Sequence, residues 1–261
     1  MTDADPTVPH HPTAAEQAAW DEVLPSMDGV DPERLAAVTK RLRSAAVQES
    51  LSPRRQMLAD LAEATRDLID RLVATEAPDE VIAAAVADLR AAAGRFDDQP
   101  FGSTYGFGES ANAPNEALFD HSPMIGIANP LAPPLTLAIE SDRVVGSVIF
   151  SHAYEGPPSC VHGGYVAAAF DEVLGAAQSL SGAPGMTGTL TVRYESPTPL
   201  LTPLRYEAWL AGVERRKIFV EGTCHAGDRL TATAKGTFIS LQAGTFLSLL
   251  EERAAQQDEH R

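Results

Sequence analysis

Residues 134–241 alternate between apolar and polar positions, which is the period of a half-buried β-strand. The pattern is interrupted once, by a segment of helical period at 163–180. Two strands, one helix and four strands in this order predict an α+β domain whose antiparallel sheet wraps around the helix. The expected strands are 134–141, 143–151, 187–196, 204–213, 217–225 and 229–241.

Residues 12–96 are rich in alanine and have the apolar spacing of helices. Asp31-Pro32-Glu33 and Ser52-Pro53 are helix starts, as is Ala77-Pro78-Asp79-Glu80, and a weaker helix is expected at 13–24. The helix from Ser52 is expected to turn Leu58, Leu61, Leu68, Leu72 and Val73 inward. The helix from Ala77 is expected to bury Val81, Ile82, Ala85, Val86 and Leu89 and to end near Gly94.

The changes in hydrophobic period and composition along the chain predict the domain organisation. We expect a disordered tail at 1–11, a helical region at 12–98, a linker loop at 99–118, the sheet domain at 119–242 and a C-terminal helical tail at 243–261. Alanine offers little apolar area, so the helices should lie on the sheet domain or on a partner subunit. The alternative is an independent helical bundle on a tether.

Charge and composition narrow the class of protein. The chain has 261 residues and a net charge of −16, which disfavours nucleic-acid binding at long range. No apolar run approaches the roughly 20 residues of a membrane helix, and the N-terminus does not look like a secretory signal. Two cysteines, Cys160 and Cys224, form no disulfide framework. We therefore expect a cytoplasmic globular protein without a membrane span.

The entry to the predicted central helix is the first candidate for chemistry. His162-Gly163-Gly164 precedes the helix directly. The first N–H groups of a helix lack internal partners and lie at the positive end of its dipole, so they can polarise a carbonyl oxygen. His162 can orient that carbonyl. The alternative is structural, with the glycines forming a tight turn and His162 capping the helix.

The same helix carries two consecutive acids. Its apolar spacing predicts a buried stripe formed by Val166, Phe170, Val173 and Ala177. Asp171 lies at the edge of that stripe, and Glu172 points further round. Asp171 could activate a water as general base or attack a carbonyl itself, unless both acids simply face water. Thr187, which opens the next strand, could bind the attacking water.

Other groupings give weaker signals. Cys160, His162, Cys224 and His225 do not have the spacing of a zinc site, so no metal is expected. No Gly-x-Ser-x-Gly elbow or phosphate-binding Gly-x4-Gly-Lys loop is present in the sequence. The basic run Arg215-Arg216-Lys217 could hold the phosphates of an acidic ligand, or it could be a solvated turn.

Several of these motifs occur together in one known family. Residues 119–241 resemble hotdog-fold acyl-CoA thioesterases, in particular the branch that includes human thioesterase superfamily members four and five and the phenylacetate-pathway enzymes. The matching strings are EGPPSCVHGGYVAAAFDEVLG, MTGTLTVRYESPTPL, ERRKIFVEG and TATAKGTFISL. The family's Asp follows its His by nine residues, as Asp171 follows His162. Arg215 departs from the family's Gly-Arg-Lys turn.

The resemblance implies a fold, an activity and roles for residues. It implies hydrolysis of acyl-CoA to CoA and a free acid, with no cofactor because CoA is part of the substrate. It also implies a homodimer or a dimer of dimers with active sites at the subunit interface. The alternative is a non-catalytic acyl-CoA binding or regulatory module. The implied catalytic residues are Asp171, His162, Gly164 and Thr187, and the implied substrate-binding residues are Gly163, Arg215, Arg216 and Lys217.

Overall fold

The computed structural model describes residues 51–99, 120–140, 142–181 and 185–240. By its internal contacts the chain divides into a unit Val38–Ser240 and a unit made of Met1–Ala37 and Leu241–Arg261, and every described residue belongs to the first. The helices expected at 13–24 and from Asp31, most of the linker, and both predicted tails lie outside the described residues.

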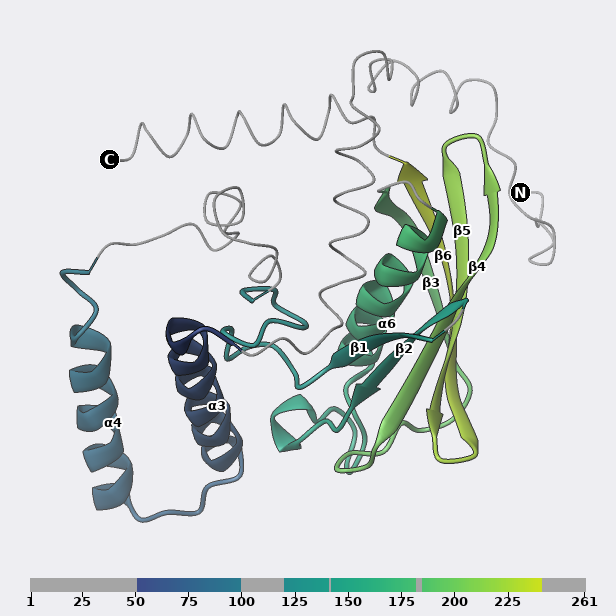
Figure 1. The fold of residues 1–261 in the computed structure, drawn as a ribbon. Helices are drawn as coiled ribbons and strands as arrows, with labels where there is room; N and C mark the ends of the chain where they lie inside the picture. Colours follow the sequence, from purple (N-terminus) through teal and green to yellow (C-terminus); the bar gives the residue numbers. More distant parts are fainter. Residues whose placement is uncertain (1–50, 100–119, 141, 182–184, 241–261) are drawn as a thin grey trace, which may run out of the picture. The chain divides into compact units, whose positions relative to one another are not determined.

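The described chain contains a six-stranded antiparallel sheet (Figure 1). The prediction of two strands, a helix and four strands is confirmed, with boundaries within a few residues. The strand order is β1-β2-β4-β5-β6-β3, so β3 pairs only with β6 and lies at an edge. The strands are β1 (Thr136–Glu140), β2 (Arg143–Val148), β3 (Gly185–Tyr194), β4 (Leu204–Glu214), β5 (Lys217–Ala226) and β6 (Arg229–Ser240).

The central helix α6 (Gly163–Gln178) packs against one face of this sheet. The predicted stripe of Val166, Phe170, Val173 and Ala177 is confirmed, since all four are buried. Phe170 contacts Tyr206 of β4 edge to face, with ring centroids 5.0 Å apart. The close approach of α6 to β2 requires glycine at position 146, because a Cβ there would lie 2.8 Å from a methyl group of Val173 on α6.

Helix α3 (Pro53–Val73) begins where the sequence predicts, with the Ser52 side chain accepting a hydrogen bond from the Arg55 N–H. Its predicted inward face is wrong in part, because Leu61, Leu72 and Val73 are exposed. The face that meets the rest of the unit combines half-buried apolar residues with polar contacts to distant parts of the chain. Arg66 donates to the Asn129 carbonyl at 3.0 Å, the Asp70 carboxylate accepts from the Ala153 N–H at 3.2 Å, and Arg55 pairs with Asp120. Ala62 is buried on α3 and lets the helix lie close.

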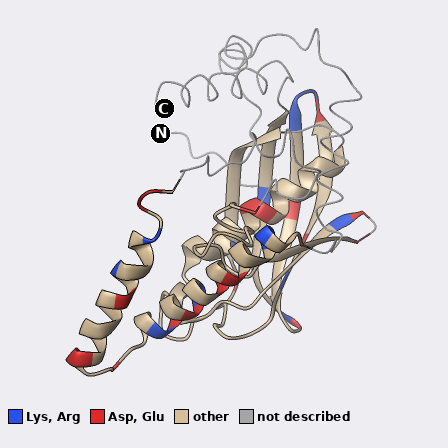
Figure 2. Ribbon diagram, turned by 60° about the vertical axis from the view of Figure 1, so that its left-hand side comes forward, with Lys and Arg blue, Asp and Glu red and all other residues tan. Residues whose placement is uncertain are grey.

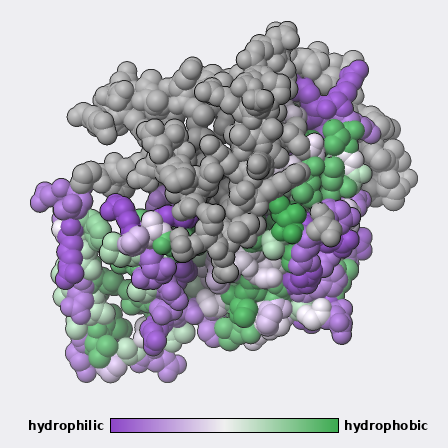
Figure 3. All heavy atoms as spheres, viewed as in Figure 1, coloured by the Kyte–Doolittle hydropathy of each residue, from purple (hydrophilic) through white to green (hydrophobic). Residues whose placement is uncertain are grey.

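Helix α4 (Asp79–Gly94) also has the predicted bounds, with Asp79 and Glu80 in its first turn. The prediction of a buried apolar face is wrong for the described chain, since Val81, Ile82, Val86 and Leu89 are 40–52% exposed and Ala85 is exposed. Figure 3 shows apolar atoms at the surface of both N-terminal helices. Helical period identifies an apolar face, but it does not identify what covers that face.

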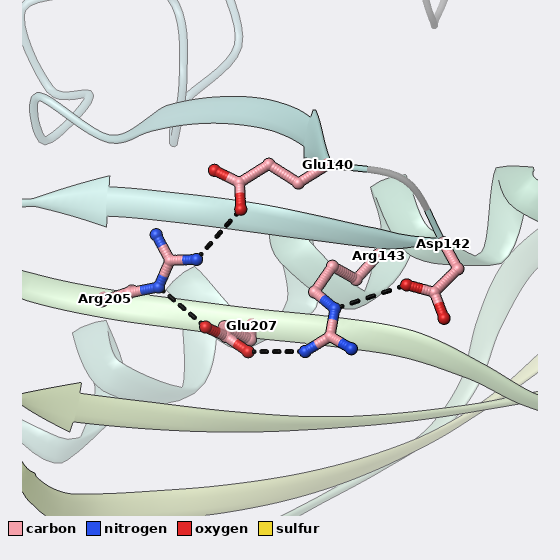
Figure 4. Close-up of polar contacts among 5 residues, drawn as sticks. All are labelled: Glu140, Asp142, Arg143, Arg205 and Glu207. Atoms are coloured by element: carbon pink, nitrogen blue, oxygen red, sulfur yellow. Dashed lines mark hydrogen bonds and ion pairs between the residues drawn. The ribbon is translucent and has the colours of Figure 1, made fainter.

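The other face of the sheet carries a row of ion pairs across β1, β2 and β4 (Figure 4). Arg205 donates to Glu140 at 3.1 Å and to Glu207 at 2.7 Å, and Arg143 donates to Glu207 at 3.0 Å. Asp142 extends the row by contacting Arg143. We call these five residues the ion-pair row. The opposite signs of neighbouring side chains stabilise strand pairing on this half-exposed face.

Within the described ranges, no helix combines the length and hydropathy needed to cross a membrane.

Candidate active site

The entry to α6 is capped by a side chain. His162 is the N-cap residue, and its Nδ1 accepts a hydrogen bond of 3.0 Å from the Gly164 N–H. For Nδ1 to accept, the ring proton must lie on Nε2, which leaves Nε2–H as a donor on an exposed imidazole. His162 therefore caps the helix, as the structural alternative expects, while its Nε2–H side stays open to solvent. The Gly164 N–H, expected to polarise a carbonyl, is already engaged by His162.

Gly163 lies between that cap and the edge strand. Its carbonyl accepts a 2.8 Å hydrogen bond from the Tyr194 hydroxyl at the end of β3. A Cβ on Gly163 would lie 3.3 Å from the same hydroxyl, so a larger residue would crowd this contact. Tyr194 was noted in the sequence only as part of a motif. Its contact fixes the start of α6 against β3.

Asp171 and Thr187 are brought together on the same flank of α6. The Thr187 hydroxyl donates to Asp171 Oδ1 at 2.9 Å, which ties the helix to the beginning of β3. Both residues are exposed in the single chain. The expectation that Thr187 binds a water is not shown; its observed partner is the carboxylate. The hydrogen bond orients Asp171 and leaves Oδ2 available to another group.

Glu172 is less exposed than its position on α6 suggests. It is half-buried, although about 200° of helical rotation separates it from Phe170. Burial, and after it the Asp171 charge, raise the pKa of its carboxyl to about 7, although a hydrogen bond from Ser122 acts in the opposite direction. The alternative in which both acids face water therefore fits Asp171, which is exposed, and does not fit Glu172.

This raised pKa predicts that Glu172 makes stability depend on pH. Below about pH 4.5 the carboxyl is protonated in both folded and unfolded chains. Between pH 4.5 and 7 only the unfolded chain releases the proton, so the free energy of unfolding decreases as pH rises. Glu172→Gln should therefore be more stable than the wild type at pH 8, by on the order of 2–3 kcal/mol, with little difference at pH 4.5.

Urea unfolding of both proteins at several pH values measures this difference. Glu207→Gln is a control of opposite sign, because Arg205 lowers the pKa of Glu207 and its charged form is the stabilising one. A difference between Glu172→Gln and wild type that is constant with pH would contradict the prediction.

The basic run Arg215-Arg216-Lys217 forms the turn between β4 and β5 (Figure 2). The residue that departs from the family pattern, Arg215, has a φ of 53°, in the left-handed region where glycine is favoured. Arg216 folds back toward the end of β6, where its guanidinium donates to the Ser240 carbonyl at 3.4 Å and its own carbonyl accepts from the Ser240 N–H at 2.7 Å. Arg216 thus has a structural contact in addition to its charge.

Arg215→Gly should stabilise the protein by up to about 1 kcal/mol, because it relieves the cost of a left-handed side-chain-bearing residue. Arg215→Ala removes the same charge without relieving the backbone and should not be stabilising. Thermal unfolding of the three proteins separates the two effects. Equal melting temperatures for the glycine and alanine variants would show that the turn is not strained.

The cysteines and histidines considered as possible metal ligands lie on different elements of the described chain. Within the part of the chain that the structure describes, no three His, Cys, Asp or Glu side chains gather as metal ligands would. Cys224 on β5 is buried, Cys160 before α6 is partly exposed, and both are free thiols.

Comparisons with known proteins match this fold and helix entry. The model of the thioesterase superfamily matches residues 159–233. Acyl-coenzyme A thioesterase THEM5 of Homo sapiens is 32% identical over 104 residues, which are 39% of each chain. Acyl-coenzyme A thioesterase THEM4 of Mus musculus is 32% identical over 88 residues, 34% of this chain and 38% of the relative. The chain thus spans about two fifths of the length of these curated relatives.

A solved structure gives a longer match. The crystal structure of a thioesterase superfamily protein is 30% identical, with a TM-score of 0.61, and the match covers 70% of this chain and 94% of that one. The antiparallel sheet around a central helix is the hotdog fold predicted from the sequence. The chain belongs to the thioesterase superfamily.

Proposed function

We propose that the protein is an acyl-CoA thioesterase that hydrolyses the thioester to a free acid and CoA. The supporting observation is Asp171, an exposed carboxylate oriented by Thr187 on the helix that His162 caps. The curated relatives that the chain matches in part are named as acyl-coenzyme A thioesterases. CoA is part of the substrate and the other reactant is water, so the proposed reaction requires no further cofactor. An acyl-CoA hydrolase fits a role in fatty acid metabolism.

Asp171 has two chemically complete routes. As a general base it takes a proton from water while the water oxygen attacks the thioester carbonyl; the C–S bond then breaks and the CoA sulfur leaves and is protonated. As a nucleophile it forms a mixed anhydride with release of CoA, and water then hydrolyses the anhydride. In either route the carbonyl oxygen gains negative charge, which the His162 Nε2–H and the helix N-terminus can stabilise.

The separation of these groups supports a homodimer. Asp171 lies nine residues after His162, about 13.5 Å along the helix axis, so the two cannot reach one carbonyl within one chain. A second copy, paired at the free edge of β3, would present its own helix entry to Asp171. We propose a homodimer, or a dimer of dimers, with each site shared between subunits. Sedimentation velocity across a range of concentrations tests this, and a stable monomer with full activity would contradict it.

The proposed site also includes the basic turn, as a binder of the CoA phosphates. Changing Arg215 and Lys217 together to Ala should raise KM for acyl-CoA much more than it lowers kcat, because phosphate binding is shared by the ground and transition states. Arg216 is left in place because it contacts Ser240. The matched control is a short thioester without the nucleotide. Equal impairment on both substrates would assign the turn a purely structural role.

A thiol-release assay tests the proposed activity directly. The purified full chain is incubated with short, medium and long acyl-CoAs, and free thiol is measured with a chromogenic reagent. Hydrolysis of at least one chain length is expected. Binding of acyl-CoA by calorimetry without thiol release would identify a binding module instead. The two free cysteines agree with the reducing cytoplasm, where we propose that the protein acts.

A further inference from the structure

Glu172 is half-buried, and the contact on its outer side comes from a part of the chain that precedes it by about fifty residues. It projects from the side of α6 that faces away from the sheet, where a helix of this fold would otherwise meet water. The hydroxyl that reaches it belongs to Ser122, which is 5% exposed. We call residues 120–133 the cover segment. Its Ile125 packs against the core that α6 helps to form.

The cover segment is a tight turn that directs one donor at Glu172. The Ser122 oxygen accepts hydrogen bonds from the N–H groups of Met124 and Ile125, at 3.2 and 3.3 Å. Its hydroxyl proton is therefore left for the Glu172 carboxyl. A Cβ on Gly126 would lie 2.5–2.6 Å from backbone atoms of Ser122 and Asp120, so the turn closes only around glycine.

The segment is in turn fixed to α3. Arg55 donates to both oxygens of Asp120, at 2.7 and 2.9 Å, and these two side chains are 17% and 12% exposed. Arg66 holds the other end of the segment at the Asn129 carbonyl. A continuous set of contacts thus runs from α3 through the cover segment to the residue beside Asp171.

We propose that Glu172 is a positioning residue of the active site, which holds the cover segment on α6 and thereby fixes the helix face that presents Asp171. The proposal rests on the proposed thioesterase function. The charged group that acts on Glu172 is Asp171 on α6. His121 and Asp120 precede Ser122 in the cover segment, and Asp120 is paired with Arg55. A pKa near 7 supports the proposal, because Glu172 then gains a buried charge close to neutral pH and the cover is held less firmly above it.

The test compares kcat and KM of full-length wild type, Glu172→Gln and Glu172→Ala from pH 5.5 to 9. Glutamine preserves the shape and a hydrogen bond to Ser122, so kcat should stay within about twofold of wild type at pH 6 and vary less around pH 7. Alanine should lower kcat about tenfold with little change in KM, the effect of a displaced catalytic group. Ser122→Ala should reproduce that loss and serves as the second variant if Glu172→Ala does not fold.

Two results would overturn the proposal: an alanine variant with the kcat of wild type, or a glutamine variant that keeps the wild-type ionisation near pH 7. Hydrogen exchange of residues 120–133 separates this proposal from the proposed function. Glu172→Ala should accelerate exchange there and Asp171→Asn should not, whether or not the protein releases thiol. Unchanged exchange in Glu172→Ala would exclude the coupling.

Discussion

Asp171→Asn should lower kcat on acyl-CoA by about two to four orders of magnitude while leaving the fold intact. Asparagine has the same shape and its amide oxygen can still accept the Thr187 hydrogen bond, which is 2.9 Å long in the native protein. It can neither take a proton from water nor attack a carbonyl. The measurement is thiol release, with circular dichroism to confirm folding.

Asp142→Asn is the matched control for this experiment. Asp142 is an exposed acid at the end of the ion-pair row, so its loss should leave kcat unchanged. Near-wild-type activity of a folded Asp171→Asn variant would contradict the assignment. The general base or nucleophile would then be another residue, and the neighbouring carboxyl group of Glu172 would be the next candidate.

Arg55→Met should reduce the free energy of unfolding by about 3–5 kcal/mol, the second large effect that we expect. The change leaves the Asp120 carboxylate in a site where its side chain is only 12% exposed, without the guanidinium that contacts both of its oxygens. Breaking a buried ion pair by removing one partner costs that much because a charge remains in a poorly solvated site. Urea unfolding monitored by circular dichroism measures the loss.

Two variants make the origin of this loss clear. Arg55→Met combined with Asp120→Asn removes the orphaned charge and should recover part of the stability. Arg143→Met, in the ion-pair row, breaks a pair with a half-exposed Arg and should cost about 1 kcal/mol or less. If Arg55→Met costs no more than Arg143→Met, α3 is not held to the unit through Asp120.

The sheet and the central helix could be predicted because local patterns determine them. Alternation along the strands and the apolar stripe of α6 both appear within short windows, and the nine-residue spacing of His162 and Asp171 is visible in the sequence. The faces of α3 and α4 could not be predicted in the same way. Leu61 and Val86 have helical spacing, but the docking face of α3 is set by Arg55, Arg66 and Asp70, whose partners lie 63 to 83 residues away.

The site shows the same limit. The sequence places Gly164 at a helix start, where its N–H should be unpaired, but it does not show that the His162 ring turns back onto that N–H. A helical projection places Glu172 toward water, because it cannot include the segment that covers it. Ser122 precedes the first predicted strand and belongs to no predicted helix or strand, and no spacing in the sequence connects it to Glu172.

The ion-pair row also bears on how the chain finds the correct strand alignment. Glu140 on β1 and Arg205 on β4 are 65 residues apart in the sequence. They can therefore pair only when the sheet has assembled. A slip of one residue between β2 and β4 would turn Arg143 toward the apolar core and leave Glu207 without it. Such a misaligned sheet would bury a charge, so the row penalises wrong registers during the slow, long-range step of folding. The ion-pair row therefore matters most for selecting the correct strand register, even though each of its pairs adds little to the stability of the folded protein.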